Sequence, residues 1–184
     1  MLVFAHTGIT LGAATIVADV ASRKPSWFAA LGNYLDIRWL LVGSLLPDII
    51  DKPIGQYIFR DTFNNGRIFA HTLLFLIVIS AAGFLLYKKK NQKWLHALAV
   101  GTFTHFILDE MWQIPQTLFW PTLGFTFPVV EDLEGWASGL WHSIFSDPKI
   151  YITEAVGLAI LLIFGIWLIK RRKLIAFLIR GRVS

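Results

Sequence analysis

Long apolar stretches alternate with short charged segments along this chain. Four of these stretches are about as long as the 20 apolar residues that an α-helix needs to span a bilayer, and a shorter one follows the first. The pattern predicts an all-α, multi-pass transmembrane helical bundle of about five helices, at Leu2–Ala21, 37–50, Phe69–Tyr87, Trp94–Trp112 and Tyr151–Ile169. The second is short, so it either spans with help from the residues before it or enters only part of the bilayer.

The composition favours a bilayer as the solvent. Hydrophobic residues make up 55% of the 184 residues and charged residues only 16%, against about 25% charged residues in typical soluble domains. A single integral membrane domain, residues 1–184, is expected for this length. The chain contains no cysteine, which excludes disulfides and thiolate ligands, so any metal site must be built from His, Asp and Glu.

Basic residues are unevenly distributed among the predicted connections. Thirteen of the 17 Lys and Arg residues lie in segments 21–38, 88–93 and 170–184, and the alternate loops 51–68 and 113–150 hold the other four. Because cytoplasmic loops collect Lys and Arg, we expect a cell-membrane protein with its N-terminus outside and its C-terminus in the cytoplasm. The basic cytoplasmic tail also suits nucleic acid or anionic lipid, but a topology signal explains it more simply, so no nucleic acid is expected.

The segment 113–149 is longer than the usual connection between helices, and loops of this length are often lids or binding elements. We expect it to be a long extracytoplasmic loop that can act as a lid. Its tryptophans, among them Trp120, Trp136 and Trp141, suit an interfacial belt better than a substrate cage. His142 is expected to be a loop residue rather than a metal ligand.

Metal-competent side chains gather on the outer side of the predicted bundle. Ionisable groups within membrane segments are unfavourable and commonly mark functional sites. Six of them, from four helices, lie at one depth on this side: His6, Asp48, Asp51, His71, His105 and Asp109. The two sides of the membrane are assigned from the Lys and Arg residues of the loops alone, without using these His and Asp residues. Their common depth on one side therefore indicates a shared site.

The spacing of these residues adds chemistry. His105 and Asp109 are four residues apart and share a helix face, and Asp48 and Asp51 are three apart across a helix end. Imidazoles and carboxylates suit a divalent metal, zinc first, with manganese or iron as alternatives, and six candidates allow one ion or two. Each residue also has a structural interpretation: His6 can hydrogen-bond between helices, His105 can simply pair with Asp109, and Asp48 can end a helix.

Four motifs stand in a fixed order, namely His6-Thr7, Gly43–Asp51, Gly66–Thr72 and Thr104–Asp109. Together they resemble the membrane-bound metal-dependent hydrolase family and, more distantly, the zinc-dependent phospholipases C. The resemblance covers about residues 1–130, most of the chain. It implies a metal held by the His and Asp residues of these motifs and hydrolysis as the reaction.

The sequence suggests roles beyond metal binding. A metal at this face would activate water for attack on a phosphoester, and Asp51 or Glu110 would take a proton or orient a ligand. The guanidinium of Arg67 suits a phosphate and, equally, an interfacial anchor. Because a lipid head group reaches this depth by lateral diffusion, the expected substrate is a lipid or amphiphilic phosphoester or pyrophosphate.

Two other classes of protein stay open. One is a metal-ion transporter, since intramembrane His and Asp residues also line ion paths. The other is a non-catalytic accessory membrane protein whose metal braces the fold. The gathering of ligands at a single depth favours the hydrolase over the transporter, and the oligomeric state is left open.

Overall fold

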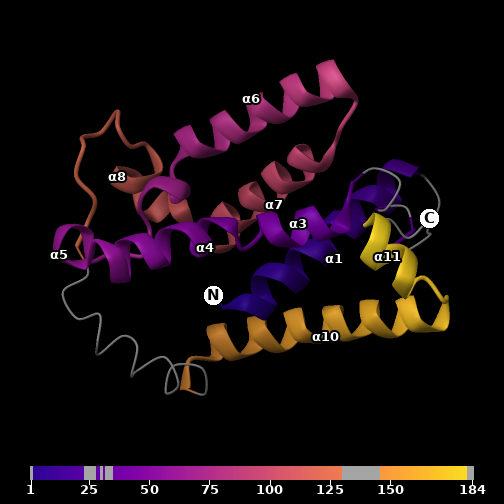
Figure 1. The fold of residues 1–184 in the computed structure, drawn as a ribbon. Coiled ribbons are helices and arrows are strands. Elements are labelled where there is room, and N and C mark those ends of the chain that lie inside the picture. The colour runs from indigo at the N-terminus through magenta and orange to yellow at the C-terminus, as the bar shows by residue number, and fades with distance from the viewer. Residues whose placement is uncertain (1, 23–27, 30, 32–34, 130–145, 182–184) are drawn as a thin grey trace.

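The computed structural model describes residues 2–22, 28–29, 31, 35–129 and 146–181, and in that part of the chain the regular structure is entirely helical (Figure 1). The expected all-α class is confirmed. The α-helices are α1 Val3–Ser22, α3 Ile37–Gly43, α4 Leu46–Pro53, α5 Arg60–Phe63, α6 Leu73–Lys90, α7 Trp94–Leu108, α8 Pro115–Leu118, α10 Pro148–Lys170 and α11 Leu174–Arg180. A π-helical turn covers Ile54–Ile58, and 3₁₀ turns cover Phe69–His71 and Met111–Gln113.

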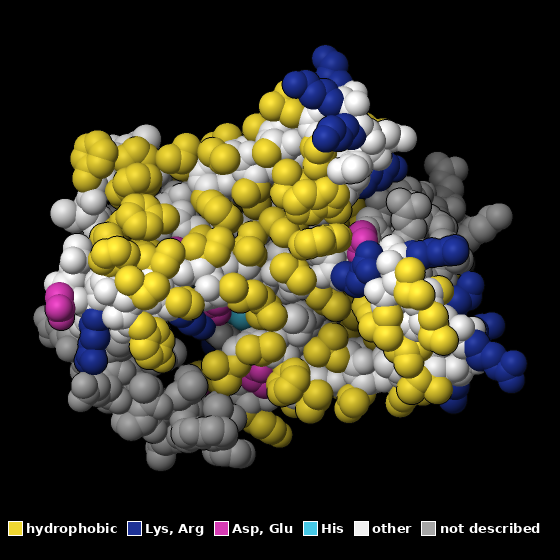
Figure 2. Space-filling model, in the orientation of Figure 1, with side chains coloured by type: hydrophobic (Ala, Val, Ile, Leu, Met, Phe, Trp, Pro, Cys, Tyr) yellow, Lys and Arg dark blue, Asp and Glu magenta, His cyan; other side chains and the backbone are white. Residues whose placement is uncertain are grey.

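The longest apolar helices are those expected to cross a membrane. Val3–Ala21 and Pro148–Lys170 are both long and apolar enough to do so, and α7 is a shorter apolar helix. Large hydrophobic side chains cover much of the outer surface (Figure 2), including Ile77 and Phe84 of α6 and Ile163 and Ile166 of α10, each about half exposed or more. Such a surface is expected where lipid, and not water, surrounds the helices.

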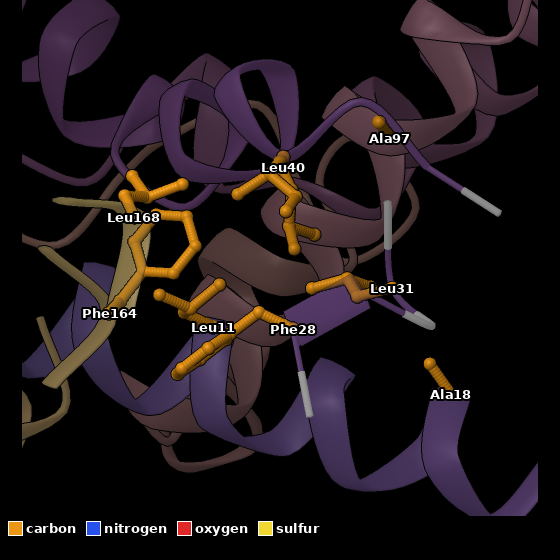
Figure 3. Packing of buried hydrophobic residues seen from close by; sticks show 9 residues of the cluster. Leu11, Ala18, Phe28, Leu31, Leu40, Ala97, Phe164 and Leu168 are labelled. Atoms are coloured by element: carbon orange, nitrogen blue, oxygen red, sulfur yellow. The ribbon is translucent and has the colours of Figure 1, made fainter. Parts of the chain in front are cut away.

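Helices α1 and α10 lie side by side and run in the same direction (Figure 1). Their backbones meet at Gly8 and Gly157, where a Cβ atom on either glycine would collide with the backbone of the other helix. Close approach at small residues is a usual way for membrane helices to associate. Beside this contact, Leu11, Phe28, Leu40, Phe164 and Leu168 fill the space between α1, α3 and α10 (Figure 3).

The glycine contact gives a test of the packing. A Cβ atom at position 157 would overlap the carbonyl oxygen of Phe4, whereas one at Gly165 of the same helix would meet nothing within 4 Å. Overpacking of this kind destabilises by about 1–3 kcal/mol. Gly157→Ala is therefore expected to lower the melting temperature of the detergent-purified protein clearly, and Gly165→Ala to leave it nearly unchanged. Equal melting temperatures for the two variants would contradict this packing.

Helices α3 and α7 cross with similarly close backbones. A Cβ atom at Gly43 would collide with the carbonyl of Leu98, and one at Gly101 with the carbonyl of Leu40. The buried hydroxyl of Thr102 on α7 donates to the carbonyl oxygen of Gly43 at 3.2 Å. This contact holds the C-terminal half of α7 against the end of α3, next to the residues expected to bind metal.

The expected helix 37–50 is interrupted. Ser44 and Leu45 separate α3 from α4, and Pro47 occupies the first turn of α4, where a proline is well tolerated. Irregular backbone at membrane depth is accepted where it is buried in protein, and Ser44 is fully buried. The break leaves the carbonyl of Ser44 available to a side chain of another helix.

Two other boundaries differ from the sequence prediction. The helix expected from Phe69 begins at Leu73, with Thr72 as its N-cap, whose hydroxyl accepts from the amide of Phe75. The helix expected to reach Trp112 ends at Leu108, because Glu110 adopts a left-handed conformation (φ 53°). In both places a metal-competent residue, His71 or Asp109, lies at the helix end and not within the helix.

The two ends of the molecule differ in chemistry. The start of α1, the start of α6 and the end of α7 lie at one end, and the lysine-rich turn between α6 and α7 lies at the other with the C-termini of α10 and α11 (Figure 1). The predicted basic tail 170–184 thus contains a folded helix, α11. Which end faces the cytoplasm, and how many helices cross the bilayer, remain predictions.

Several expectations concern residues outside the described part of the chain. They include Trp136, Trp141 and His142 within the predicted loop 113–149, of which residues 130–145 are not described. They also include the basic residues Arg23, Lys24 and Arg182. The described start of this loop contains helix α8, Pro115–Leu118.

Candidate metal centre

Four of the six predicted ligands meet at the end of the bundle opposite the lysine-rich turn. Asp48 comes from α4, His71 from the 3₁₀ turn before α6, and His105 and Asp109 from the end of α7. One ligand atom of each lies within 4.8 Å of the others, so this group could hold a metal ion. Three separate segments of the chain therefore supply two imidazoles and two carboxylates to one point.

The two histidines of this group have their Nε2 atoms only 3.2 Å apart. The Nδ1 atom of His71 lies 2.7 Å from the Asp51 carboxylate, and that of His105 lies 2.8 Å from the Ser44 carbonyl oxygen. Both partners accept hydrogen bonds and cannot donate them, so in each neutral imidazole Nδ1 carries the proton. Both Nε2 atoms then present lone pairs to the same buried point, which favours a cation there.

The spacing of the ligand atoms fits a single ion. Four ligands about 2.1 Å from a tetrahedral zinc ion lie roughly 3.4 Å from one another. The Oδ1 atom of Asp48 lies 3.6 Å from Nε2 of His71 and 4.0 Å from Nε2 of His105, and Nε2 of His105 lies 3.9 Å from Oδ2 of Asp109. These four distances of 3.2–4.0 Å, within a group whose ligand atoms all lie within 4.8 Å of one another, need only small side-chain adjustments to reach such a sphere.

Asp51, predicted as a ligand or a proton acceptor, lies outside this group of four. Its carboxylate is fully buried and accepts from the backbone amides of Ile68, Ala70 and His71 as well as from the His71 ring. With its oxygens engaged in this way, Asp51 orients the imidazole of His71. It also holds residues 68–71 out of the α-helix, which explains why α6 begins later than expected.

This arrangement predicts a specific effect of neutralising Asp51. In Asp51→Asn the side chain keeps its size but no longer accepts the Nδ1 proton of His71 as a charged partner. Loss of such an outer partner typically lowers metal affinity 10–100-fold. Competition with a chelator of known affinity would measure this, with Asp61→Asn, an exposed carboxylate on α5, as the control. Unchanged affinity in Asp51→Asn would contradict the orienting role.

His6, the remaining predicted ligand, lies beside the group of four. Its fully buried ring stacks on His105 with centroids 4.2 Å apart, and its Nε2 atom lies 3.1 Å from Oδ1 of Asp109. Its Nδ1 atom has no hydrogen-bond partner among the described residues. His6 can therefore either position Asp109 or turn toward an ion as a further ligand.

Arg67 contacts a predicted ligand directly. Its Nε and Nη2 atoms donate to Oδ2 of Asp109 at 2.9 and 2.7 Å, and its side chain is 38% exposed. Residues 66–68 are non-helical, so the four-residue spacing between Arg67 and His71 does not place their side chains one helical turn apart. Its guanidinium reaches the centre by way of Asp109, with part of the side chain open to the surface.

The charges around the centre leave a place for a cation. Three carboxylates lie there, of Asp48, Asp51 and Asp109, against the two cations Arg67 and Lys52, whose Nζ atom is 2.7 Å from Asp48. With neutral histidines the group therefore carries one net negative charge. A buried excess charge is unfavourable in a membrane environment, and a divalent ion would offset it.

Glu110 lies at the edge of a cavity next to the centre. The cavity has a volume of about 280 Å³ and is lined by Arg67, Leu108, Asp109, Glu110, Gln113, Ile114, Lys149 and Ile150. Glu110 accepts from Lys149 of α10 and from Gln113, both at 2.7 Å. Because Asp109 belongs both to the cavity wall and to the group of four, the cavity borders the centre.

The sequence prediction missed several residues that shape the centre. Glu154 of α10 accepts from the backbone amides of Leu2, Phe4 and Ala5 and so fixes the start of α1, where His6 lies. Glu154 could have been selected from the sequence, because it is an ionisable residue within an apolar helix, the feature that selected the predicted ligands. The contributions of Ser44 and Lys52 had no such signal, since one is made by a backbone carbonyl and the other by a lysine of the predicted loop 51–68, which the structure places in the last turn of α4.

Comparison with known proteins identifies the kind of protein but no activity. A family model described as YdjM inner membrane protein matches residues 1–178. No curated protein and no solved structure matches the chain. The match covers every residue of the candidate centre, and its description states a membrane location.

Proposed function

This chain belongs to the YdjM inner membrane protein family, and from that premise we propose that it is a membrane-embedded, metal-dependent hydrolase. The proposed substrate is a phosphoester or pyrophosphate of a lipid or amphiphile. We place the reaction at the extracytoplasmic interface, because the candidate centre lies at the end of the bundle opposite the lysine-rich turn and the basic residues that follow α10.

The observation that carries the proposal is the pair of buried imidazoles. Asp51 and the Ser44 carbonyl hold the Nδ1 protons of His71 and His105, so two Nε2 lone pairs converge 3.2 Å apart with carboxylates beside them. A packing contact between helices needs no such convergence of lone pairs. The donor set of two nitrogens and two oxygens suits zinc, with manganese or iron as alternatives.

When bound, a divalent ion would acidify water and polarise a phosphoryl oxygen. The residues of the chain supply the rest of the site. Arg67 pairs with Asp109 and is partly exposed in the cavity wall. Its guanidinium group can reorient to bind a phosphoryl oxygen. Glu110, at the cavity edge and paired with Lys149, is placed to accept a proton at its carboxylate from water that enters the cavity.

The position of the cavity supports an amphiphilic substrate. Its lining combines charged groups with Leu108, Ile114 and Ile150, and it opens near the start of α10, whose Tyr151 and Ile152 are more than half exposed. Figure 2 shows a hollow between α4 and α10 in which acidic and basic side chains are visible. A head group in the cavity would leave its acyl chains against apolar helix faces.

The proposal is tested with the full chain purified in detergent. Elemental analysis would establish the metal, and phosphate release would be measured on phospholipids, lipid phosphates and lipid pyrophosphates. We expect a stoichiometric metal and release from at least one class of substrate, lost on chelation and restored by the metal. A retained metal without turnover on any of these substrates would contradict the hydrolase, and metal flux into proteoliposomes would assign the centre to transport.

A further inference from the structure

A second cavity lies at the opposite, basic end of the molecule. It has a volume of about 580 Å³ and is formed by the start of α3, the turn before α7 and the end of α11. Its lining includes Asp36, Arg38, Trp39, Lys93, Trp94 and Arg180. None of them belongs to the candidate metal centre.

The walls of this basic-end cavity are tied together by Arg38. Its Nε and Nη2 atoms donate to the Asp36 carboxylate at 3.2 and 2.9 Å, and its Nη1 atom donates to the carbonyls of Leu178 and Ile179 at 2.8 and 3.0 Å. The amide of Ile37 also donates to the carbonyl of Gly181. Helix α11 is thereby fixed to the start of α3, and the cavity between them is preformed.

The cavity carries excess positive charge. Arg38 and Asp36 neutralise each other, whereas Lys93 and Arg180 are exposed and form no ion pair within the described part of the chain. Lys93 lies 5.8 Å from the ring centre of Tyr87. It also precedes the first turn of α7, whose amides receive no side-chain cap. The positive end of the α7 dipole therefore adds to the positive potential in the cavity.

Apolar groups surround these cations. Trp39 and Trp94 lie against each other with ring centroids 4.9 Å apart, and tryptophan is characteristic of the membrane interface. On α11, Ile175, Leu178 and Ile179 are 71%, 61% and 70% exposed. Figure 2 shows hydrophobic side chains along the outer face of this helix, with Lys and Arg side chains around it. A short helix of this kind suits a position in the interface plane.

We propose that the basic-end cavity binds the phosphodiester of an anionic phospholipid from the adjacent leaflet. Lys93 and Arg180 contact the phosphate, Trp39 and Trp94 lie at the level of the glycerol, and the acyl chains follow the exposed face of α11. Basic pockets between membrane helices are known to recognise anionic head groups in this manner. The site is independent of the proposed hydrolase, because it shares no residue with it.

The test is native mass spectrometry of the full chain in detergent, titrated with phosphatidylglycerol or phosphatidylcholine. The wild type is expected to bind the anionic lipid about tenfold more tightly than the zwitterionic one. The double variant Lys93→Gln/Arg180→Gln is expected to lose about tenfold of that affinity. The matched control, Lys170→Gln/Arg171→Gln, removes two exposed charges from the same end outside the cavity and is expected to change affinity less than about twofold.

Three outcomes would overturn the proposal. Equal losses in the two double variants would show general attraction between charges. Displacement of the lipid by inorganic phosphate at about 10 mM would assign the cavity to a free anion. Equal binding of the two lipids by the wild type would show that no anionic site exists. An unchanged melting temperature in detergent would confirm that each variant is folded.

Discussion

Replacing His71 with alanine is expected to remove the metal from the protein and to reduce phosphate release to the uncatalysed background. His71 offers its Nε2 lone pair to the centre because Asp51 holds its Nδ1 proton. Loss of an outer partner alone commonly lowers metal affinity or activity 10–100-fold, so loss of the ligand itself should exceed about 100-fold. Metal content per chain and initial rates of phosphate release would measure the effect.

The matched control is His96→Ala. His96 is a partly buried histidine on α7 that packs against Tyr87, with ring centroids 5.7 Å apart, and it lies in the half of α7 away from the centre. This variant is expected to keep its metal and its turnover. If His71→Ala and His96→Ala behaved alike, the centre would not lie where His71 places it.

The second large effect is expected at Asp109. Its carboxylate lies between Arg67, which donates two hydrogen bonds, and His6, whose Nε2 atom is 3.1 Å away. In Asp109→Asn the side chain keeps its size, but the proposed metal ligand loses its charge and Arg67 loses the carboxylate that accepts its two hydrogen bonds. Because the charged ligand oxygen is lost while the partly exposed Arg67 stays solvated, we expect weaker metal binding and turnover reduced more than about 100-fold, in line with the effects of changes at metal sites.

Asp61→Asn provides the comparison for this variant, since Asp61 is an exposed carboxylate on α5. A second experiment measures the turnover of Asp109→Asn with excess metal in the assay. If Asp109 acts as a ligand, excess metal should restore part of the turnover of Asp109→Asn. Full turnover of Asp109→Asn without added metal would contradict the assignment of this residue.

The meeting of the four ligands was predictable from two simple rules. Side chains four residues apart on a helix share a face, which placed His105 with Asp109. The apolar runs gave the ends of the helices and the distribution of lysines and arginines gave the side of the membrane on which each end lies, which placed Asp48 and His71 at the same depth. In the structure, ligand atoms of four of the six predicted residues lie within 4.8 Å of one another, and their binding of a metal stays a prediction.

The division of roles within the set was not predictable from spacing. Asp48 and Asp51 are three residues apart on α4, yet Asp48 faces the Nε2 atoms of the imidazoles, whereas Asp51 accepts from Nδ1 of His71 and from the backbone amides of residues 68–71. The difference arises because unpaired amides before α6 attract the buried carboxylate. Only the tertiary arrangement shows where those amides lie, and hydrophobic patterning does not report them.

The interrupted helix is a similar case. The apolar run 37–50 gave no indication that Ser44 would offer its carbonyl to His105, because the contact depends on the close crossing of α3 and α7 at Gly43 and Gly101. Glu154 is different. It was visible in the sequence as a carboxylate within an apolar helix, and the same rule that selected the other acidic residues would have selected it.

X-ray absorption spectroscopy of the full chain, loaded with one equivalent of zinc, tests the central claim most directly. The claim is that His71 and His105 face one ion together with the carboxylates of Asp48 and Asp109. The predicted spectrum contains the scattering of two imidazoles at about 2.0–2.1 Å with oxygen ligands completing the shell, and one imidazole fewer in His105→Ala. A shell made only of oxygen ligands, or the same spectrum in wild type and His105→Ala, would contradict it.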